Sequence, residues 1–402
     1  METAIERFFR YSKIYTTSDE DSGVFPSSER QLDLARLLVS ELCKLNLSDI
    51  HIDDGGNVIA TLPGNVDKQV PVLALMAHMD TSPDAPGENV AARVVRYEGG
   101  ELRLNDSVSL TEKLCPGIEK QVGEELIVTD GTTLLGADDK AGIAEIMTAL
   151  EKLVTENLPH GELRIVFSTD EEIGCGTERL DVQTLACDFG YTVDGGALGE
   201  IEYENFNAAA GKAEFRGVGV HPGSAKGVMV NASTAAMYFA SLLPADEVPE
   251  KTEGYEGFFH LHNMSGSVTK AELNYIIRDH DSEKFAAKKA LFEKCGKLVN
   301  EKFGDGTCTV TVTDTYYNMK EKILPHMHLI KRAEKAFEEN GVQPQCVPIR
   351  GGTDGAVLSW MGLPCPNLST GGYNFHGVRE WIPVKSLEKM SDVLVSLVQS
   401  FL

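Results

Sequence analysis

The clearest helix that the sequence predicts follows a glycine-containing turn at residues 134–136. Behind this turn the hydrophobic positions recur three, four and seven residues apart, at Ile143, Ile146, Met147, Leu150, Leu153 and Val154. This spacing is typical of a helix with one buried face. Two adjacent carboxylates, Asp138 and Asp139, stand at the entrance of the predicted helix.

Three short apolar runs, at residues 70–77, 163–168 and 191–193, lack the alternation of a half-exposed strand. Such runs predict buried strands of a parallel sheet. The same part of the chain contains two further helical patterns, at 5–11 and 30–45. It also contains a hairpin-like segment at 51–62 and a turn-rich segment at 83–130. Because helix and strand patterns alternate, the sequence predicts an α/β fold with a doubly wound mixed sheet.

The pattern changes from about residue 206. Predicted strands and helices follow one another in the order β-α-β-β-α-β, at 212–220, 231–243, 258–262, 272–279, 282–303 and 307–314. This order is the split βαβ arrangement of ferredoxin-like α+β domains. We therefore expect a discontinuous catalytic domain at 1–205 and 320–402, and an inserted domain at 206–319.

Length and composition are consistent with two domains. A chain of 402 residues is long for one hydrophobic core, and its 42% hydrophobic and 24% charged residues are typical of a globular protein. The net charge of −24 argues against nucleic acid as a partner, because phosphate recognition needs clustered Lys and Arg. An acidic field of this kind would attract cations and peptide amines.

The sequence also predicts a cytoplasmic location. The first ten residues form an amphipathic pattern without a secretory core, and no apolar run approaches the roughly 20 residues of a membrane span. The eight cysteines contain no Cys-x-x-Cys pair, which indicates reduced thiols. We expect no membrane partner.

Candidate metal ligands follow each of the three buried strands. His78 and Asp80 come after the first run, Glu171 and Glu172 after the second, and Asp194 after the third. Ligands of an open α/β sheet bind beyond the carboxyl ends of its strands, so these side chains are expected to converge there. The Asp-Asp pair alone has a simpler interpretation as a helix cap. Together with the other candidate ligands it indicates a metal site.

A hydrolytic site with two metal ions needs a bridging carboxylate, further His and carboxylate ligands, and a free carboxylate that activates water. Glu171 is the candidate base, and Asp80 is placed to orient the imidazole of His78 from behind. Spacing alone does not decide between Asp138 and Asp139 for the bridge. The five candidate ligands are His78, Asp138, Glu172, Asp194 and His376.

Other chemistries have weaker support. The pairs His260-x-His262 and His326-x-His328 lack an acidic cluster after a buried strand, and we interpret them as ordinary surface histidines. The sequence contains no His-Glu-x-x-His helix and no Gly-x-Ser-x-Gly elbow. Gly217-Val218-Gly219 is followed by Val-His-Pro, which disfavours a nucleotide-binding loop.

The chain resembles the M20 metallopeptidases almost from end to end. The resemblance is carried by residues 77–84, 134–142, 170–174, 191–196, 221–223, 225–232, 275–279, 350–355 and 367–377. Within the family, residues 225–232 and 350–355 are most similar to its tripeptide aminopeptidases. The resemblance implies two Zn²⁺ ions per subunit, for which Co²⁺ or Mn²⁺ can substitute.

The same resemblance implies individual roles. Asp138 would bridge the ions, His78 and Asp194 would bind one, and Glu172 and His376 the other. Glu171 would act as the general base, and Asp80 would lie behind His78.

In members of the family that the chain resembles, the inserted domain closes as a lid over the substrate. His221 is then expected to stabilise an oxyanion or bind a carbonyl, and Asn231, Arg278 and Arg350 are expected to hold the carboxylate of a small peptide. Bidentate Arg–carboxylate pairing suits this role. The alternative for each arginine is a structural ion pair.

The sequence therefore predicts a di-zinc aminopeptidase that releases the N-terminal residue from tripeptides. One alternative is another M20-type hydrolase: a dipeptidase, a carboxypeptidase or an N-acyl deacylase. A second is a non-catalytic protein that binds peptide or metal. A third interpretation makes the inserted domain the interface of a homodimer, as in relatives.

Overall fold

The computed structural model describes residues 1–402, and the chain divides into two compact units. Unit 1 comprises Met1–Tyr203, Met319–Val347 and Thr353–Leu402, and unit 2 comprises Glu204–Asn318 and Pro348–Gly352. Unit 2 thus contains a short second segment that the sequence pattern placed in the other domain.

A mixed eight-stranded sheet forms the centre of unit 1. Its strands are β1 (Ser48–Ile52), β2 (Val58–Leu62), β3 (Leu73–His78), β8 (Leu163–Ser168), β9 (Phe189–Gly195), β10 (Glu200–Glu202), β15 (Gln345–Cys346) and β16 (Asn367–Ser369). They run in the order β1-β2-β8-β3-β9-β16-β10-β15. Strand β3 pairs in parallel with both β8 and β9, and β16 continues the parallel pairing beyond β9. The predicted mixed α/β sheet is confirmed.

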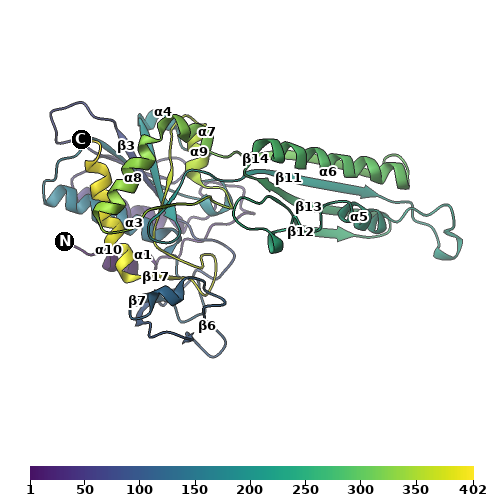
Figure 1. The fold of residues 1–402 in the computed structure, drawn as a ribbon, viewed down its shortest axis with the longest axis horizontal. Helices are drawn as coiled ribbons and strands as arrows, with labels where there is room; N and C mark the ends of the chain where they lie inside the picture. The colour runs from purple at the N-terminus through teal and green to yellow at the C-terminus, as the bar shows by residue number, and fades with distance from the viewer. The chain divides into compact units, whose positions relative to one another are not determined.

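Helices cover both faces of this sheet. The helices of unit 1 are α1 (Ala4–Tyr11), α2 (Gln31–Lys44), α3 (Ala137–Thr155), α4 (Val182–Leu185), α7 (Lys320–Ile323), α8 (His328–Glu339), α9 (Asp354–Trp360) and α10 (Val384–Gln399). Helix α3 packs on β3 and β9 and contacts α1 and α10, as Figure 1 also shows. On the other face, Ala74 and Met76 of β3 pack with Leu358 of α9. Residues of β3 are buried on both faces, which explains its continuous apolar run.

The turn-rich segment contributes two small sheets. They consist of β4 (Arg93–Arg96), β7 (Glu125–Val128) and β17 (Trp381–Pro383) in one, and β5 (Leu102–Arg103) with β6 (Ser109–Leu110) in the other. Trp381 is fully buried and stacks on Tyr373, with ring centroids 4.1 Å apart. The same two residues exchange two backbone hydrogen bonds. This pair closes the loop that contains His376.

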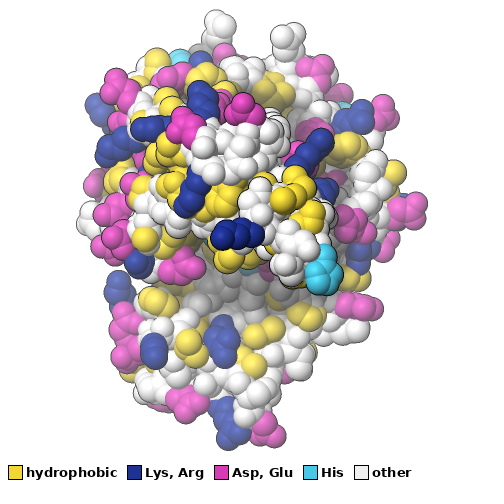
Figure 2. All heavy atoms as spheres, turned by 90° about the vertical axis from the view of Figure 1, so that its right-hand side faces the viewer, with side chains coloured by type: hydrophobic (Ala, Val, Ile, Leu, Met, Phe, Trp, Pro, Cys, Tyr) yellow, Lys and Arg dark blue, Asp and Glu magenta, His cyan; other side chains and the backbone are white.

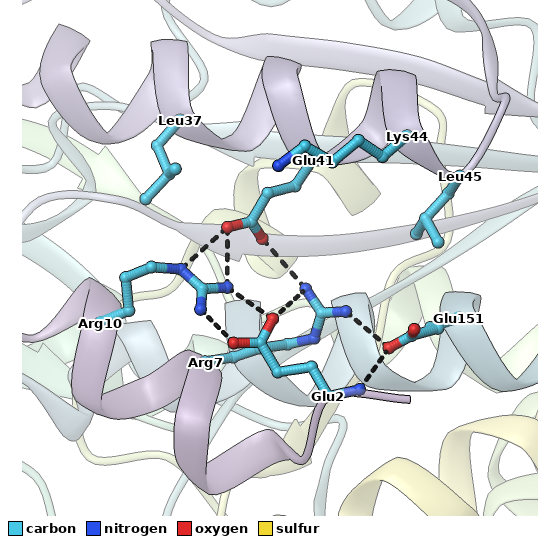
Figure 3. A pocket seen from close by; sticks show the side chains of 8 residues that line it. All are labelled: Glu2, Arg7, Arg10, Leu37, Glu41, Lys44, Leu45 and Glu151. Carbon is cyan, nitrogen blue, oxygen red and sulfur yellow. Dashed lines mark hydrogen bonds and ion pairs between the residues drawn. The ribbon is translucent and has the colours of Figure 1, made fainter.

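An ion-pair network ties the N-terminal helix to unit 1. Arg7 contacts Glu41 of α2 at 3.0 Å and Glu151 of α3 at 2.8 Å, and Arg10 contacts Glu41 at 2.7 Å. These residues line a cavity of about 340 Å³ (Figure 3). Because both arginines are paired with carboxylates, we assign the network a structural role.

Unit 2 has the predicted β-α-β-β-α-β order. Its elements are β11 (Asn207–Arg216), α5 (Ala232–Ser241), β12 (Phe258–Gly266), β13 (Lys270–Asp279), α6 (Ser282–Phe303) and β14 (Cys308–Tyr316). The sheet order is β12-β13-β11-β14, with every neighbour antiparallel. Helices α5 and α6 cover one face (Figure 1), where Phe215, Phe239 and Phe292 lie in the core. The split βαβ prediction is confirmed.

The first strand of unit 2 begins earlier than its sequence pattern indicates. The prediction placed it at 212–220, whereas β11 ends at Arg216 and Val218 pairs instead with Val230 outside the sheet. The run Ala208–Ala210 has no strand pattern of its own. Pairing with β13 and β14 on both sides makes it a strand.

No helix combines the length and the apolar character needed to cross a lipid bilayer. All eight cysteines are free. On the face drawn in Figure 2, basic side chains are scattered among acidic ones and do not form a single patch.

Candidate metal centre

His78 is the last residue of β3, and its imidazole is buried among carboxylates. Its Nε2 atom lies 2.9 Å from Oδ1 of Asp138 and 3.4 Å from Oδ1 of Asp194. Asp194 comes from the neighbouring parallel strand β9. The strand ends therefore bring these side chains together as the sheet topology predicts.

Asp138 contacts the imidazoles of both predicted histidine ligands. Its Oδ2 atom lies 3.3 Å from Nε2 of His376, while its Oδ1 atom faces His78. Asp139 is also buried, but its Oδ2 atom accepts a hydrogen bond from the backbone N–H of His78 at 3.1 Å. Of the two adjacent carboxylates, only that of Asp138 lies between the two histidines.

Glu172 completes the second half of the cluster. Its Oε2 atom lies 2.8 Å from Nε2 of His376, and its Oε1 atom is buried without a hydrogen-bond partner. His376 is less buried than His78, and its Nδ1 atom lies 3.5 Å from the exposed carboxylate of Asp84. One side of the cluster is therefore accessible to solvent.

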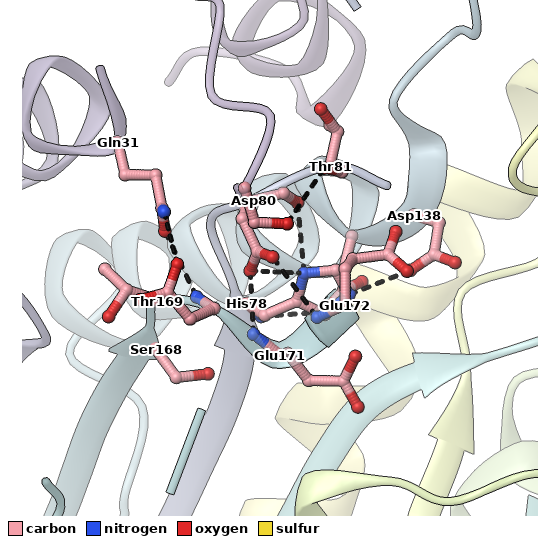
Figure 4. Close-up of polar contacts among 12 residues, drawn as sticks. Gln31, His78, Asp80, Thr81, Asp138, Ser168, Thr169, Glu171 and Glu172 are labelled. Carbon is pink, nitrogen blue, oxygen red and sulfur yellow. Dashed lines mark hydrogen bonds and ion pairs between the residues drawn. The ribbon is translucent and has the colours of Figure 1, made fainter. Parts of the chain in front are cut away.

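Asp80 holds the turn after β8. It is fully buried, and its two carboxylate oxygens accept the backbone N–H groups of Glu171 at 3.0 Å and Glu172 at 3.2 Å. The Nδ1 atom of His78 lies 3.1 Å from the Asp80 carbonyl oxygen and 3.4 Å from its carboxylate. Figure 4 shows Asp80 between His78 and this turn. Asp80 thus contacts both groups.

The side-chain carboxylate of Glu171 takes no part in these contacts with Asp80. It points away from Asp80 in Figure 4 and carries no drawn interaction. Burial, followed by the negative charge of Asp194, raises the pKa of Glu171 well above its usual value. Its geometry is that of a free carboxylate beside a candidate metal ligand.

The cluster contains more carboxyl groups than imidazoles, and each group changes the pKa of its neighbours. Hydrogen bonds to Asp138 and Glu172 raise the pKa of His376 to about 11. Burial raises the pKa of Glu172 and of Asp194 to about 7 each. Burial opposes ionisation of Asp138 as well, but hydrogen bonds from His376 and His78 outweigh it and lower the pKa of Asp138.

The donor set fits divalent zinc. Two overlapping groups of ligand atoms lie within 4.8 Å of one another: His78 with Asp139 and Asp194, and His78 with Asp138 and Glu172. Imidazole nitrogen and carboxylate oxygen are common zinc ligands. Buried Oδ1 of Asp139 and Oε1 of Glu172 have no hydrogen-bond partner, as expected of atoms near a cation. Asp139 is in the first group, but its hydrogen bond to His78 N–H leaves Asp138 as the better bridge.

Two predicted substrate residues, His221 and Asn231, lie in unit 2 in the segment between β11 and α5. The Nδ1 atom of exposed His221 accepts a hydrogen bond from the N–H of Gly223. Asn231 is the N-cap of α5, and its side-chain oxygen accepts the N–H of Thr234. Both side chains therefore have local structural contacts in unit 2.

The two predicted arginines differ in how their donors are used. Arg350 donates to the carbonyl oxygens of Gly254 and Glu256 and to both oxygens of Thr252. Arg278 donates to the carbonyl oxygen of Arg350 at 3.0 Å, but its Nε is buried without a partner. Arg278 is therefore engaged by fewer acceptors within the protein than Arg350 is.

The sequence interpretation missed Glu380. This buried residue accepts three backbone N–H groups of the loop that leads into α3. The only local signal is its position four residues after His376, and nothing in the neighbouring residues indicates that it binds the loop before α3. The sequence interpretation also missed Asp354. Its carboxylate accepts a hydrogen bond from the hydroxyl of Ser168, which precedes the Glu171 turn.

Comparison with known proteins agrees with this geometry. Residues 128–400 match the sequence profile described as Peptidase family M20/M25/M40. Proteins named Peptidase T from Halothermothrix orenii and Caldanaerobacter subterraneus subsp. tengcongensis are 51% and 49% identical, each match covering 100% of this chain and 99% of the relative.

A solved structure has a similar fold throughout. The crystal structure of aminopeptidase PepT from Bacillus cereus ATCC 10987 superposes with a TM-score of 0.79 at 25% identity, covering 99% of this chain and 98% of that chain. The resemblance that the sequence motifs indicated is confirmed. The chain belongs to peptidase family M20/M25/M40.

Proposed function

We propose that this chain is a di-zinc aminopeptidase that releases the N-terminal residue from tripeptides. The observation that carries the proposal is the Asp138 carboxylate, which lies between His78 and His376 with the free carboxylate of Glu171 beside the cluster. The names of the Peptidase T relatives support the choice of substrate.

The proposed ligand assignment follows the contacts. His78 and Asp194 would hold one ion and Glu172 and His376 the other. Asp138, whose carboxylate contacts both histidines, would be a ligand shared by the two ions. Bound zinc supplies Lewis acidity, which polarises a peptide carbonyl and lowers the pKa of water.

Glu171 is the proposed general base. Its carboxylate is free to accept a proton from the attacking water, and it then donates a proton to the leaving amine. Asp80 holds the backbone of the Glu171 turn and contacts His78, so it fixes base and ligand relative to one another.

The proposed substrate contacts come from unit 2. His221 stabilises the oxyanion or binds the substrate carbonyl, and Asn231, Arg278 and Arg350 are the candidates for the peptide carboxylate. Arg278 is the strongest of these, because it donates one hydrogen bond within the protein whereas Arg350 donates four, and a guanidinium can form a bidentate pair with a carboxylate. The reduced thiols expected from the cysteine pattern support a cytoplasmic setting.

Metal removal and return test the proposal. Protein stripped with a chelator should lose hydrolysis of a free tripeptide, and titration with Zn²⁺ should restore it as two ions bind per chain. Hydrolysis that persists in fully stripped protein would contradict the metal-dependent mechanism. A single ion at full activity would contradict the bridging role of Asp138.

A further inference from the structure

The Glu380 carboxylate is a three-fold acceptor at the entrance of α3. Its Oε2 atom accepts the N–H groups of Leu135 at 2.6 Å and Gly136 at 2.8 Å, and its Oε1 atom accepts the N–H of Asp138 at 3.0 Å. Glu380 is 1% exposed, so water does not compete for these contacts.

The backbone that these bonds hold is not regular helix. Gly136 has a left-handed φ of 74°, and Asp138 has φ −86° and ψ 104°, outside the helical region. The first N–H groups of a helix have no partner within the helix. Without Glu380, the N–H groups of Leu135, Gly136 and Asp138 would lose their side-chain acceptor.

The same carboxylate joins two loops that are distant in sequence. Glu380 follows His376 in the loop that the Tyr373–Trp381 stack closes. Its three bonds attach this loop to the one that contains Asp138. The contact between His376 Nε2 and Asp138 Oδ2 at 3.3 Å therefore depends on two loops whose spacing Glu380 sets.

We propose that Glu380 is a positioning residue of the metal centre: it fixes the Asp138 loop so that the two oxygens of Asp138 face the two ligand histidines. This inference rests on the proposed metal-binding function and adds a residue to it. Glu380 itself is not a proposed ligand, because both of its oxygens accept hydrogen bonds from backbone N–H groups.

The test measures metal binding directly. Glu380→Gln keeps the side-chain volume, and its amide oxygen can still accept the N–H groups of Leu135 and Gly136. Its NH₂ group then faces the N–H of Asp138, so that contact is lost. Glu380→Asp keeps both oxygens but withdraws them by one methylene, which gives a second variant that retains the charge.

Glu145→Gln is the matched control. Glu145 is also fully buried and lies on α3, but neither of its oxygens has a hydrogen-bond partner. Affinity is measured by chelator competition with Zn²⁺, and ligand geometry by the visible spectrum of the Co²⁺ form. Thermal unfolding of the metal-free proteins reports any general loss of stability.

We expect Glu380→Gln to weaken metal binding by roughly 10- to 100-fold, the range found when groups behind a ligand are changed. The Co²⁺ spectrum should shift, Glu380→Asp should weaken binding less, and Glu145→Gln should match the parent. Binding within threefold of the parent in both Glu380 variants, with an unchanged spectrum, would overturn the inference alone. A parent protein that binds no metal would overturn the proposed function as well.

Discussion

The backbone N–H of Glu171 donates a hydrogen bond to the Asp80 carboxylate at 3.0 Å. The neighbouring N–H of Glu172 donates to the other oxygen of the same carboxylate. One buried side chain therefore fixes the turn that presents both the proposed base and a proposed ligand, and it also contacts His78. Asp80 therefore sets the spacing between the proposed base and the proposed ligand His78.

Replacing Asp80 by Ala should lower kcat by about 100-fold, because a displacement of about 1 Å in a reacting group can have that effect. KM should change little, since Asp80 does not reach the substrate. Asp80→Asn keeps one acceptor oxygen, so its kcat should lie between those of the parent and Asp80→Ala. Steady-state kinetics at saturating Zn²⁺ measure this, and an Asp80→Ala enzyme with parental kcat would contradict the positioning role.

Replacing Glu171 by Gln should remove the proton acceptor without changing side-chain volume. A general base contributes roughly 10²- to 10⁴-fold, and kcat should fall by that factor. Because the Glu171 carboxylate is not a proposed ligand, two Zn²⁺ ions should still bind, as measured by equilibrium dialysis. Parental rates in the variant would assign the base to another group.

The sequence predicted the groups that stand on regular elements. His78 ends β3, Asp194 lies near the end of β9, and Glu172 follows β8. The apolar runs of these strands are plain in the sequence, and the parallel pairing of β8, β3 and β9 brings their ends together. The split βαβ order was visible for the same reason, because strand and helix periods alternate clearly from β12 to β14.

Residues that act through contacts with the backbone have no recognisable pattern in the sequence. Glu380 binds N–H groups that any residue at 135, 136 and 138 would present, so no residue type in that loop reveals its partner. The attachment of Pro348–Gly352 to unit 2 likewise depends on Ile349 N–H donating to the Glu204 carbonyl oxygen and on Arg350. Long-range pairing of this kind has no local sequence signature.

The two arginines of unit 2 should respond differently to substitution. Arg278→Met should raise KM for a free tripeptide by roughly 10- to 100-fold, the effect of losing a charge-assisted hydrogen bond of about 1.5–3 kcal/mol. A tripeptide with an amidated C-terminus should show a much smaller difference between variant and parent. Equal loss on both substrates would remove Arg278 from carboxylate recognition.

Arg350→Met tests the other interpretation of that pair. Its donors bind the carbonyl oxygens of the 252–256 loop, so their loss should lower the free energy of unfolding by about 1–3 kcal/mol. Thermal unfolding measures this change. A variant with parental stability and a specific defect on the free carboxylate would instead make Arg350 a direct ligand of the substrate.

Glu202 should make stability depend on pH. Burial raises the pKa of Glu202 to about 8 from its ordinary 4.5, while its Oε2 atom accepts a hydrogen bond from Asn367. A raised carboxyl pKa means that the folded chain binds the proton more tightly than the unfolded chain. The stabilisation is complete below pH 4.5 and is lost as the pH rises to about 8.

Glu202→Gln stays neutral and keeps an acceptor oxygen for Asn367. Between pH 5 and 8 its stability should therefore decline less steeply than that of the parent, by up to about 1.4 kcal/mol per pH unit. Denaturant unfolding across this range measures the slope, with exposed Glu88→Gln as the control. Parallel slopes for parent and Glu202→Gln would contradict the assignment.

The proposed aminopeptidase activity is tested most directly by measuring release of the N-terminal residue by the zinc-loaded protein. The substrates are a free tripeptide, its N-acetylated form, and the matching dipeptide and tetrapeptide. Rapid, chelator-sensitive release from the free tripeptide alone is the predicted result, since an aminopeptidase needs the free amine and a carboxylate at a fixed distance. Preferred cleavage of the acetylated peptide or the dipeptide would contradict the account and assign the same metal centre to another M20-type hydrolase.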